Sequence, residues 1–200
     1  MRPILNNFGF NMAIDKIILG IDPGTNIMGY GVIALKGRSM KLVSAGILNL
    51  SKIADHHLKL KKIYERSTGL IEEYHPDEVA VEAPFFGKNV QSMLKLGRAQ
   101  GVAIAAALSR EVPVFEYSPK KIKQSITGNG NASKEQVAAM LQSMLKFDEM
   151  PKYLDATDGL AAAVCHYFQN TSGAGNVSGK GGKVSGGWKS FLKENPDRKV

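Results

Sequence analysis

Short apolar runs separated by turns dominate the first quarter of the chain. Residues 17–21 are apolar at almost every position, as in a central strand covered on both faces, and the turn Pro23-Gly24 follows them. A second run spans residues 30–35, and a third alternates loosely over 40–50 after Gly37. Runs of this length bounded by Gly and Pro predict strands. Three strands joined by short turns predict an antiparallel meander.

Helical spacing appears after the third run. Apolar residues recur every three or four positions over 53–74, with Ser51 as the expected N-cap and His75-Pro76 as the end. The later part of a second helical stretch is small and apolar around most of its circumference, which predicts burial or a shared subunit surface. The remaining predicted elements are a strand over 78–84, that helix over 89–110, a strand over 112–117, and two helices, one ending at Leu145 and one over 154–168.

This order of elements predicts an α/β fold. Three antiparallel strands followed by strand–helix alternation favour a five-stranded mixed sheet with helices on both faces. Residues 1–15 show no period and are interpreted as an N-terminal extension, whereas residues 16–169 can form one domain. Residues 170–200 are rich in Gly, Ser and Lys, which predicts a flexible tail around a short aromatic segment at Trp188.

Charge and cysteine content narrow the class of protein. The formal net charge is +8, and the tail holds half of it, with six basic against two acidic residues. A basic balance favours polyanionic partners, and we expect the tail to add nonspecific phosphate contacts. No apolar run approaches the roughly 18 residues that span a bilayer, and no secretory signal is present. The single cysteine, Cys165, excludes an intrachain disulfide and is expected to pack within a helix, so we expect a cytoplasmic location.

Four carboxylates suggest metal-dependent chemistry on phosphates. Asp22 and Glu82 each close a predicted strand, and Asp155 and Asp158 lie three residues apart at a predicted helix start, on one face. Each has an ordinary explanation alone, since Asp favours turns and acids favour the first helical turn. Clustered carboxylates, however, need a counter-charge, and Mg²⁺ accepts such oxygens where phosphates are the substrate. Two such ions can activate water and stabilise the leaving oxygen of a phosphodiester.

Five short motifs also occur in one order along residues 16–168. They are Gly20-Ile-Asp22-Pro-Gly-Thr25, Gly29-Tyr-Gly31, Val81-Glu82-Ala-Pro-Phe85, Lys95-Leu-Gly97-Arg-Ala-Gln-Gly101 and Asp155-Ala-Thr-Asp158-Gly-Leu-Ala-Ala-Ala163. In sequence and order they resemble the RuvC family of bacterial Holliday junction resolvases. The resemblance implies a ribonuclease H-like fold, a homodimer, and Mg²⁺-dependent paired nicking of four-way DNA junctions in recombination and repair. It also implies ligatable 5′-phosphate ends and cooperation with the RuvA–RuvB branch-migration complex.

The resemblance also implies roles for seven residues. The positions matching the family's metal-binding catalytic acids are Asp22, Glu82, Asp155 and Asp158, expected to hold two Mg²⁺ ions per subunit, with Mn²⁺ as a substitute. Phe85 matches an aromatic residue that inserts near the junction crossover, where it can stack on bases. Lys123 and Lys134 match basic positions linked to DNA contact and catalysis. Core packing for Phe85 and plain solvation for the two lysines are the alternatives.

The sequence is also compatible with two other functions. The turn Asp22-Pro-Gly-Thr25 also suits the phosphates of an ATP-binding protein of the actin and sugar-kinase type, although 200 residues are short for its second half. A junction-binding module without catalysis is the other alternative, but it would lack some of the acids.

Overall fold

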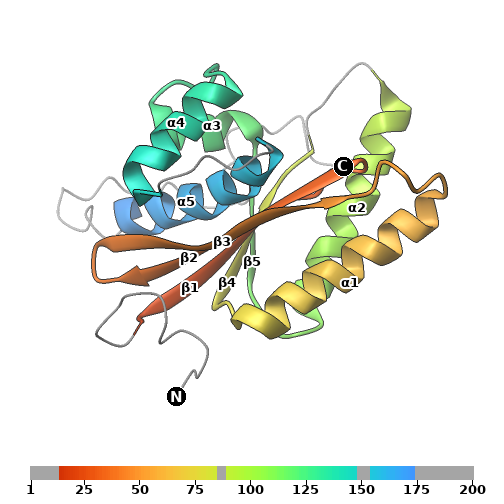
Figure 1. Ribbon diagram of the computed structural model, residues 1–200, viewed down its shortest axis with the longest axis horizontal. Helices are drawn as coiled ribbons and strands as arrows, with labels where there is room; N and C mark the ends of the chain where they lie inside the picture. The colour runs from red at the N-terminus through yellow and green to blue at the C-terminus, as the bar shows by residue number, and fades with distance from the viewer. Residues whose placement is uncertain (1–13, 85–88, 148–153, 174–200) are drawn as a thin grey trace, which may run out of the picture. The chain divides into compact units, whose positions relative to one another are not determined.

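A five-stranded mixed sheet forms the centre of the protein (Figure 1). The computed structural model describes residues 14–84, 89–147 and 154–173. The strand order is β3-β2-β1-β4-β5, in which β1, β2 and β3 are antiparallel neighbours and β4 and β5 run parallel to β1. The predicted meander and mixed sheet are therefore confirmed. The strands are β1 (Lys16–Asp22), β2 (Ile27–Lys36), β3 (Ser39–Asn49), β4 (Glu78–Glu82) and β5 (Val114–Tyr117).

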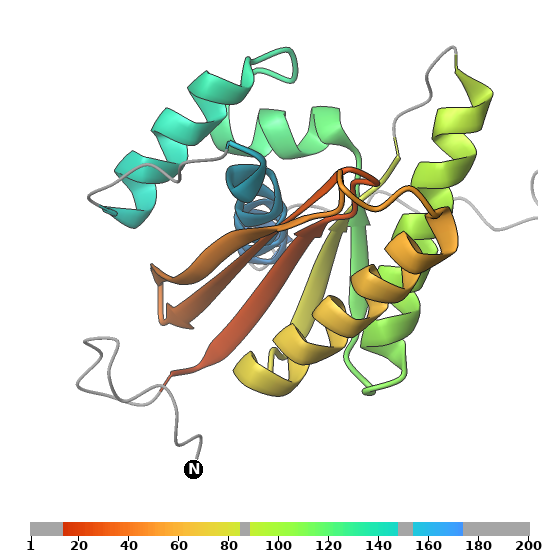
Figure 2. The same cartoon turned by 45° about the vertical axis from the view of Figure 1, so that its right-hand side comes forward.

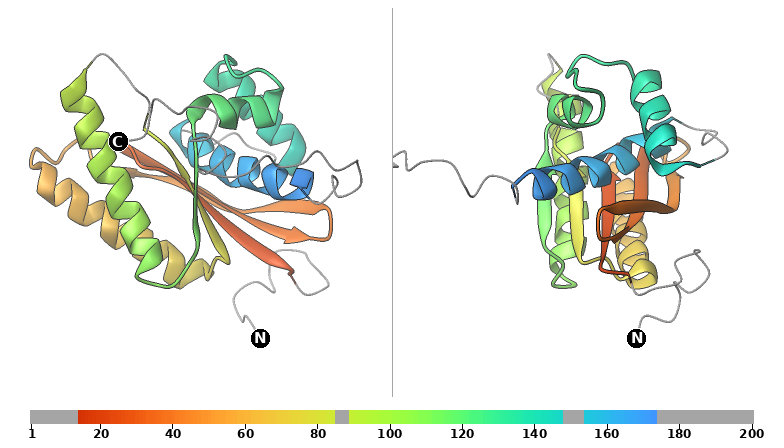
Figure 3. Two further views of the ribbon diagram at one scale, coloured as in Figure 1. Left: turned by 180° about the vertical axis from the view of Figure 1, so that it is seen from behind. Right: turned by 90° about the vertical axis from the view of Figure 1, so that its left-hand side faces the viewer.

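Helices cover both faces of the sheet (Figures 2 and 3). Because side chains alternate along a strand, Ile17, Leu19 and Ile21 of β1 pack with α1 and α2, whereas Ile18 packs with the helices opposite. Cys165 is buried in that second layer, as predicted. The helices of the first layer are α1 (His56–Tyr74) and α2 (Val90–Leu108), and those of the second are α3 (Pro119–Thr127), α4 (Lys134–Leu145) and α5 (Asp155–Gly173).

The predicted cap of α1 is wrong. Ser51 lies in a turn, where its backbone N–H and its hydroxyl both donate to Asn49 Oδ1, at 3.0 and 2.6 Å. The helix begins five residues later, and Asp55 caps it by accepting from Leu58 N at 2.9 Å. The side chain of Asn49 captures the serine, so the chain reaches the helix through an additional loop.

Helix α3 is not among the predicted helices, because six of its eight residues after Pro119 are basic or polar and show little apolar periodicity. It has clear local signals nonetheless: Ser118 caps it, Pro119 occupies the first turn, and Gly128 ends it at φ 76°. Ile122 and Ile126 are buried one turn apart. Helix α5 also extends to residue 173, beyond the predicted end at 168.

The start of α5 lies directly on the backbone of β1 and β2. A Cβ atom added at Gly20 would overlap the carbonyl oxygen of Gly159, and one at Gly29 would overlap that of Asp155. Gly31, opposite Gly20 in the register, meets the helix backbone in the same way. Only glycine at these strand positions allows so close an approach.

A buried polar cluster holds the far end of α5. The His166 side chain is fully buried, with Nε2 2.7 Å from Glu78 Oε2 and Nδ1 2.6 Å from the Tyr117 hydroxyl. Lys16 Nζ lies 2.8 Å from Glu78 Oε1. Burial lowers the pKa of His166 against the opposing influence of Glu78, and it raises the pKa of Tyr117 to about 12. The cluster fastens α5 to β4 and β5.

Candidate active site

Two of the predicted acids meet at one edge of the sheet. Asp22 is the last residue of β1 and Glu82 the last residue of β4. These strands are parallel neighbours, with Ile21 opposite Val81, so both carboxylates leave the sheet at the same edge. Each acid ends a strand, as predicted, and the parallel pairing makes the two strand ends neighbours.

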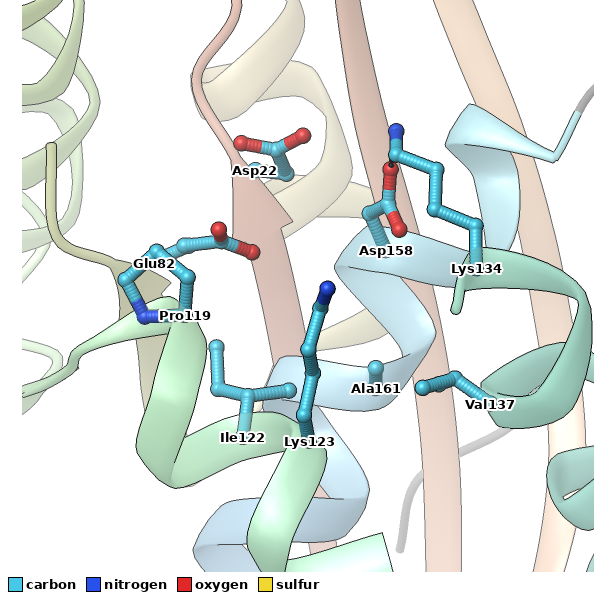
Figure 4. Close-up of a pocket in the computed structure, with 9 residues that line it drawn as sticks. All are labelled: Asp22, Glu82, Pro119, Ile122, Lys123, Lys134, Val137, Asp158 and Ala161. Carbon is cyan, nitrogen blue, oxygen red and sulfur yellow. Dashed lines mark hydrogen bonds and ion pairs between the residues drawn. The ribbon is translucent and has the colours of Figure 1, made fainter. Parts of the chain in front are cut away.

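The glycine contacts of α5 bring a third acid to this edge. Asp158 lies in the first turn of the helix and faces Asp22 and Glu82 across a cleft of about 100 Å³ (Figure 4). Asp155, one turn earlier, does not line the cleft and has 36% of its side chain exposed. The cleft residues are Asp22, Glu82, Pro119, Ile122, Lys123, Lys134, Val137, Asp158 and Ala161.

Both predicted lysines point toward the carboxylates. Lys123, from α3, extends into the cleft between Glu82 and Asp158 (Figure 4). Lys134, the first residue of α4, places Nζ 2.5 Å from Asp158 Oδ2 and 3.3 Å from Asp155 Oδ1. Burial disfavours the charged lysine, but these ion pairs outweigh it and raise the pKa of Lys134. Through its ion pairs with both acids, Lys134 links Asp155, which does not line the cleft, to Asp158, which does.

The cleft carries more negative potential than two lysines offset. Burial, and next the charge of Asp158, raises the pKa of Asp22 to about 7. Burial, with the charges of Asp22 and Asp158, raises the pKa of Glu82 to about 8. Burial also raises the pKa of Asp158. Carboxylates that resist ionisation together provide a favourable environment for a divalent cation.

The donor set suits a hard cation such as Mg²⁺, which binds carboxylate oxygens. Within residues 14–84, 89–147 and 154–173, no three Asp, Glu, His or Cys side chains already converge closely enough to enclose one ion. Lys134 holds Asp155 and Asp158 in ion pairs instead. A cation bound by Asp155 or Asp158 would therefore have to displace Lys134 from these acids.

These pKa values predict how stability responds to pH. Glu82 keeps its proton in the folded protein up to about pH 8 but loses it near its ordinary pKa when unfolded, so its contribution to stability falls as pH rises between these values. Glu82→Gln, which mimics the protonated side chain, should therefore match wild type near pH 5 without divalent ions. At pH 8.5 it should be more stable by about 1–3 kcal/mol, or about 3–8 °C in Tm.

Thermal unfolding of both proteins across this pH range, with EDTA, measures the difference. Adding Mg²⁺ at pH 8.5 should raise the Tm of wild type more than that of Glu82→Gln, because the ion stabilises the charged carboxylate. A Tm difference that stays constant from pH 5 to 8.5 would contradict a raised pKa for Glu82.

The structure thus brings Asp22, Glu82, Asp158 and both lysines to one cleft, whereas Asp155 lies outside its lining and is ion-paired with Lys134. Phe85, the predicted stacking residue, lies outside the described residues, as do most of the predicted N-terminal extension and tail. The apolar wall of the cleft was not predicted, because half of it comes from α3. The spacing of Ile122 and Ile126 behind Ser118-Pro119 was the available signal.

Comparisons with known proteins agree with this site. Residues 18–166 match the family model for crossover junction endodeoxyribonuclease RuvC. The chain is 67% identical over 186 residues to the crossover junction endodeoxyribonuclease RuvC of Cytophaga hutchinsonii, covering 93% of this chain and 89% of that protein. It is 62% identical over 184 residues to that of Christiangramia forsetii, covering 92% and 93%.

Solved structures show the same relationship. The T. thermophilus RuvC in complex with Holliday junction substrate matches with a TM-score of 0.73 and 33% identity, covering 79% of this chain and 96% of that one. The yeast mitochondrial Holliday junction resolvase Ydc2 matches with a TM-score of 0.55 and 13% identity, a likeness of fold alone.

Proposed function

The chain belongs to the RuvC family of crossover junction endodeoxyribonucleases, and we propose that it resolves Holliday junctions by hydrolysing phosphodiester bonds in two opposed strands during recombination and repair. The fold is that of the RuvC structures, which are ribonuclease H-like. One observation carries the proposal: Asp22, Glu82 and Asp158 converge in a cleft with Lys123 and Lys134, in a chain so similar to named resolvases.

The family is metal-dependent, and for this chain we propose two Mg²⁺ ions per subunit, replaceable by Mn²⁺. Asp22, Glu82, Asp155 and Asp158 would hold them. Bound there, the ions would lower the pKa of an attacking water and stabilise the leaving 3′-oxygen. Asp22 and Glu82 are poised for this role, since their raised pKa values make them gain most from an added positive charge.

The two lysines would contact phosphate groups of the DNA. Lys123 projects into the cleft from α3 and is placed to contact a non-bridging oxygen of the scissile phosphate. Lys134 keeps its charge, and when it releases Asp155 and Asp158 its ammonium is free for a neighbouring phosphate. Phe85 would stack on a base near the crossover, because the strand that ends in Glu82 leads directly to it.

A homodimer would place two such sites on opposed strands. Its proposed surface is one exposed stripe of α2, on the side of the helix away from the sheet. Val90, Leu94 and Leu108 are 59%, 52% and 58% exposed on this stripe. Gly97 and Gly101 lie between them, and a Cβ at either would meet nothing in its own subunit. Each glycine costs a helix about 1 kcal/mol relative to alanine, so close approach of a second copy explains them best.

Leu94→Glu is expected to convert the dimer to monomers, because it places charge at the centre of this apolar stripe. Sedimentation velocity should show the change of mass, and cleavage should switch from paired to single, uncoordinated nicks. Met140→Glu is the matched control, since Met140 is 40% exposed on α4, across the sheet, and its variant should remain dimeric. Dimers of unchanged affinity in Leu94→Glu would refute the α2 interface.

The remaining partners are proposed from the family resemblance. We propose that the protein works with the RuvA–RuvB complex in the cytoplasm, and that the basic tail adds nonspecific phosphate contacts. In the described part of the chain, no helix is both long and apolar enough to cross a membrane.

Cleavage of a labelled mobile four-way junction with Mg²⁺, beside a linear duplex of the same sequence, tests the function. Symmetric nicks in the junction and none in the duplex are expected. Equal cutting of both would indicate a general nuclease. Tight junction binding without any cutting would indicate the non-catalytic module, and saturable ATP binding would favour the kinase-like alternative.

A further inference from the structure

A second hollow, of about 140 Å³, adjoins the cleft. Asp22, Glu82 and Pro119 line both, so they form a shared wall. The two differ in chemistry, because the cleft holds lysines and carboxylates, whereas the described walls of the hollow beyond the shared acids are mostly apolar. We call this hollow the side pocket and define it by Ala83, Pro84, Leu96 and Gln100.

Gln100 is the one polar side chain among these four pocket-defining residues. It lies on the sheet-facing side of α2 and is only 8% exposed. Its Nε2 donates to Glu116 Oε2 on β5 at 2.5 Å. A carboxylate at neutral pH only accepts, so this contact fixes which end of the amide is nitrogen. Among residues 14–84, 89–147 and 154–173, the carbonyl oxygen and the second amide hydrogen make no other hydrogen bond, so this oriented group can recognise a ligand.

The size and lining of the side pocket match one component of DNA. A nucleobase has apolar faces and a polar edge, and side-chain amides pair with such edges through one donor and one acceptor. The volume is well below the roughly 300 Å³ of a small-molecule site, so it suits a single base rather than a larger ligand. A nucleotide whose phosphate lies in the cleft carries its base within reach of the adjoining hollow.

We propose that the side pocket receives the base of a nucleotide adjacent to the scissile phosphate and that Gln100 reads its edge, which gives the cut a base preference. This inference rests on the proposed nuclease function, and it assigns sequence selectivity to Gln100. Apolar contact from Leu96 and Pro84 holds the base, and Glu116 orients the amide.

The test uses full-length protein and junctions with one fixed scissile position. Each nucleotide flanking the nick is varied through the four bases, and single-turnover cleavage rates are measured. Wild type should discriminate among the bases at one flanking position by about fivefold or more, the lower end expected for an amide–base pair. Gln100→Met keeps the side-chain length but removes both polar groups, and it should reduce this range to about twofold.

Two further variants separate base reading from folding. Glu116 is exposed, so Glu116→Gln should leave the fold intact, yet it allows the Gln100 amide to turn over and should also relax the preference. Gln124→Met makes the same chemical change on the exposed side of α3 and should keep the wild-type pattern. Junction affinity measured with Ca²⁺ should be equal in all four proteins.

The outcomes are distinct. Equal rates for all four bases in wild type, or a preference that persists in both Gln100→Met and Glu116→Gln, would overturn the side-pocket assignment while leaving the resolvase function in place. Failure of wild type to cut any junction would overturn the proposed function itself. Relaxed preference in both variants, with Gln124→Met unchanged, is the supporting result.

Discussion

Asp22→Asn is expected to lower the rate of junction cleavage by at least a thousandfold and to leave junction affinity within about twofold. Loss of about 4 kcal/mol of transition-state stabilisation corresponds to such a rate. Asp22 belongs to the cluster of acids and lines both the cleft and the side pocket. A neutral amide at this position would therefore weaken cation binding. Affinity should persist, because phosphate contacts spread over a basic surface supply most of it.

Paired assays separate these effects. Single-turnover cleavage gives the rate, and gel-shift titration with Ca²⁺ gives the affinity. Asp15→Asn is the control: Asp15 precedes the same strand at its opposite end, where it is exposed and accepts from Gly37 N at 2.7 Å. Its cleavage should remain near wild type. Joint loss of cleavage and binding in Asp22→Asn would point to a folding role instead.

Gly29→Ala should reduce cleavage by about a hundredfold, through geometry rather than charge. Gly29 lies opposite Asp22 in the β1–β2 register, and the added Cβ would overlap the carbonyl oxygen of Asp155. The start of α5 must then move outward and carry Asp155 and Asp158 with it. A misplacement of about 1 Å in a catalytic group can cost about a hundredfold in rate. The overlap should also destabilise the fold by about 1–3 kcal/mol.

Gly69→Ala is the matched control for this substitution. Gly69 lies within α1, where a Cβ would meet nothing within 4 Å, so its variant should be active and up to about 1 kcal/mol more stable. Thermal unfolding and cleavage rates measure both effects. Wild-type activity in Gly29→Ala would mean that the acids of α5 tolerate displacement.

The carboxylates at the ends of β1 and β4 could be predicted, because local sequence patterns determine where each strand ends. Apolar runs ending at Asp22 and Glu82 predict two strands that each end in a carboxylate, and the structure pairs these strands in parallel. The acid spacing at Asp155 and Asp158 likewise reflects a single helical turn. Such features depend on residues near one another in the chain.

Contacts between separate elements could not be predicted from such local patterns. The hydrogen bond from Gln100 to Glu116 joins two consecutive elements whose packing the sequence pattern does not specify, and the contact of His166 with Glu78 joins residues 88 apart in the sequence. The capture of Ser51 by Asn49 is local, but it competes with an equally reasonable cap. Family resemblance supplied the roles of Lys123 and Lys134, which spacing alone would not have distinguished from solvated lysines.

The glycine contacts beneath α5 have a consequence for how this enzyme can vary. At Gly20, Gly29 and Gly31 the separation between helix and sheet is set by main-chain atoms, which are the same in every amino acid. Substitutions among the surrounding core side chains can therefore accumulate without changing the distance from Asp158 to Asp22. The spacing of the proposed catalytic acids is thus protected from such changes, and the restriction falls on a few glycines where an added side chain would overlap the helix.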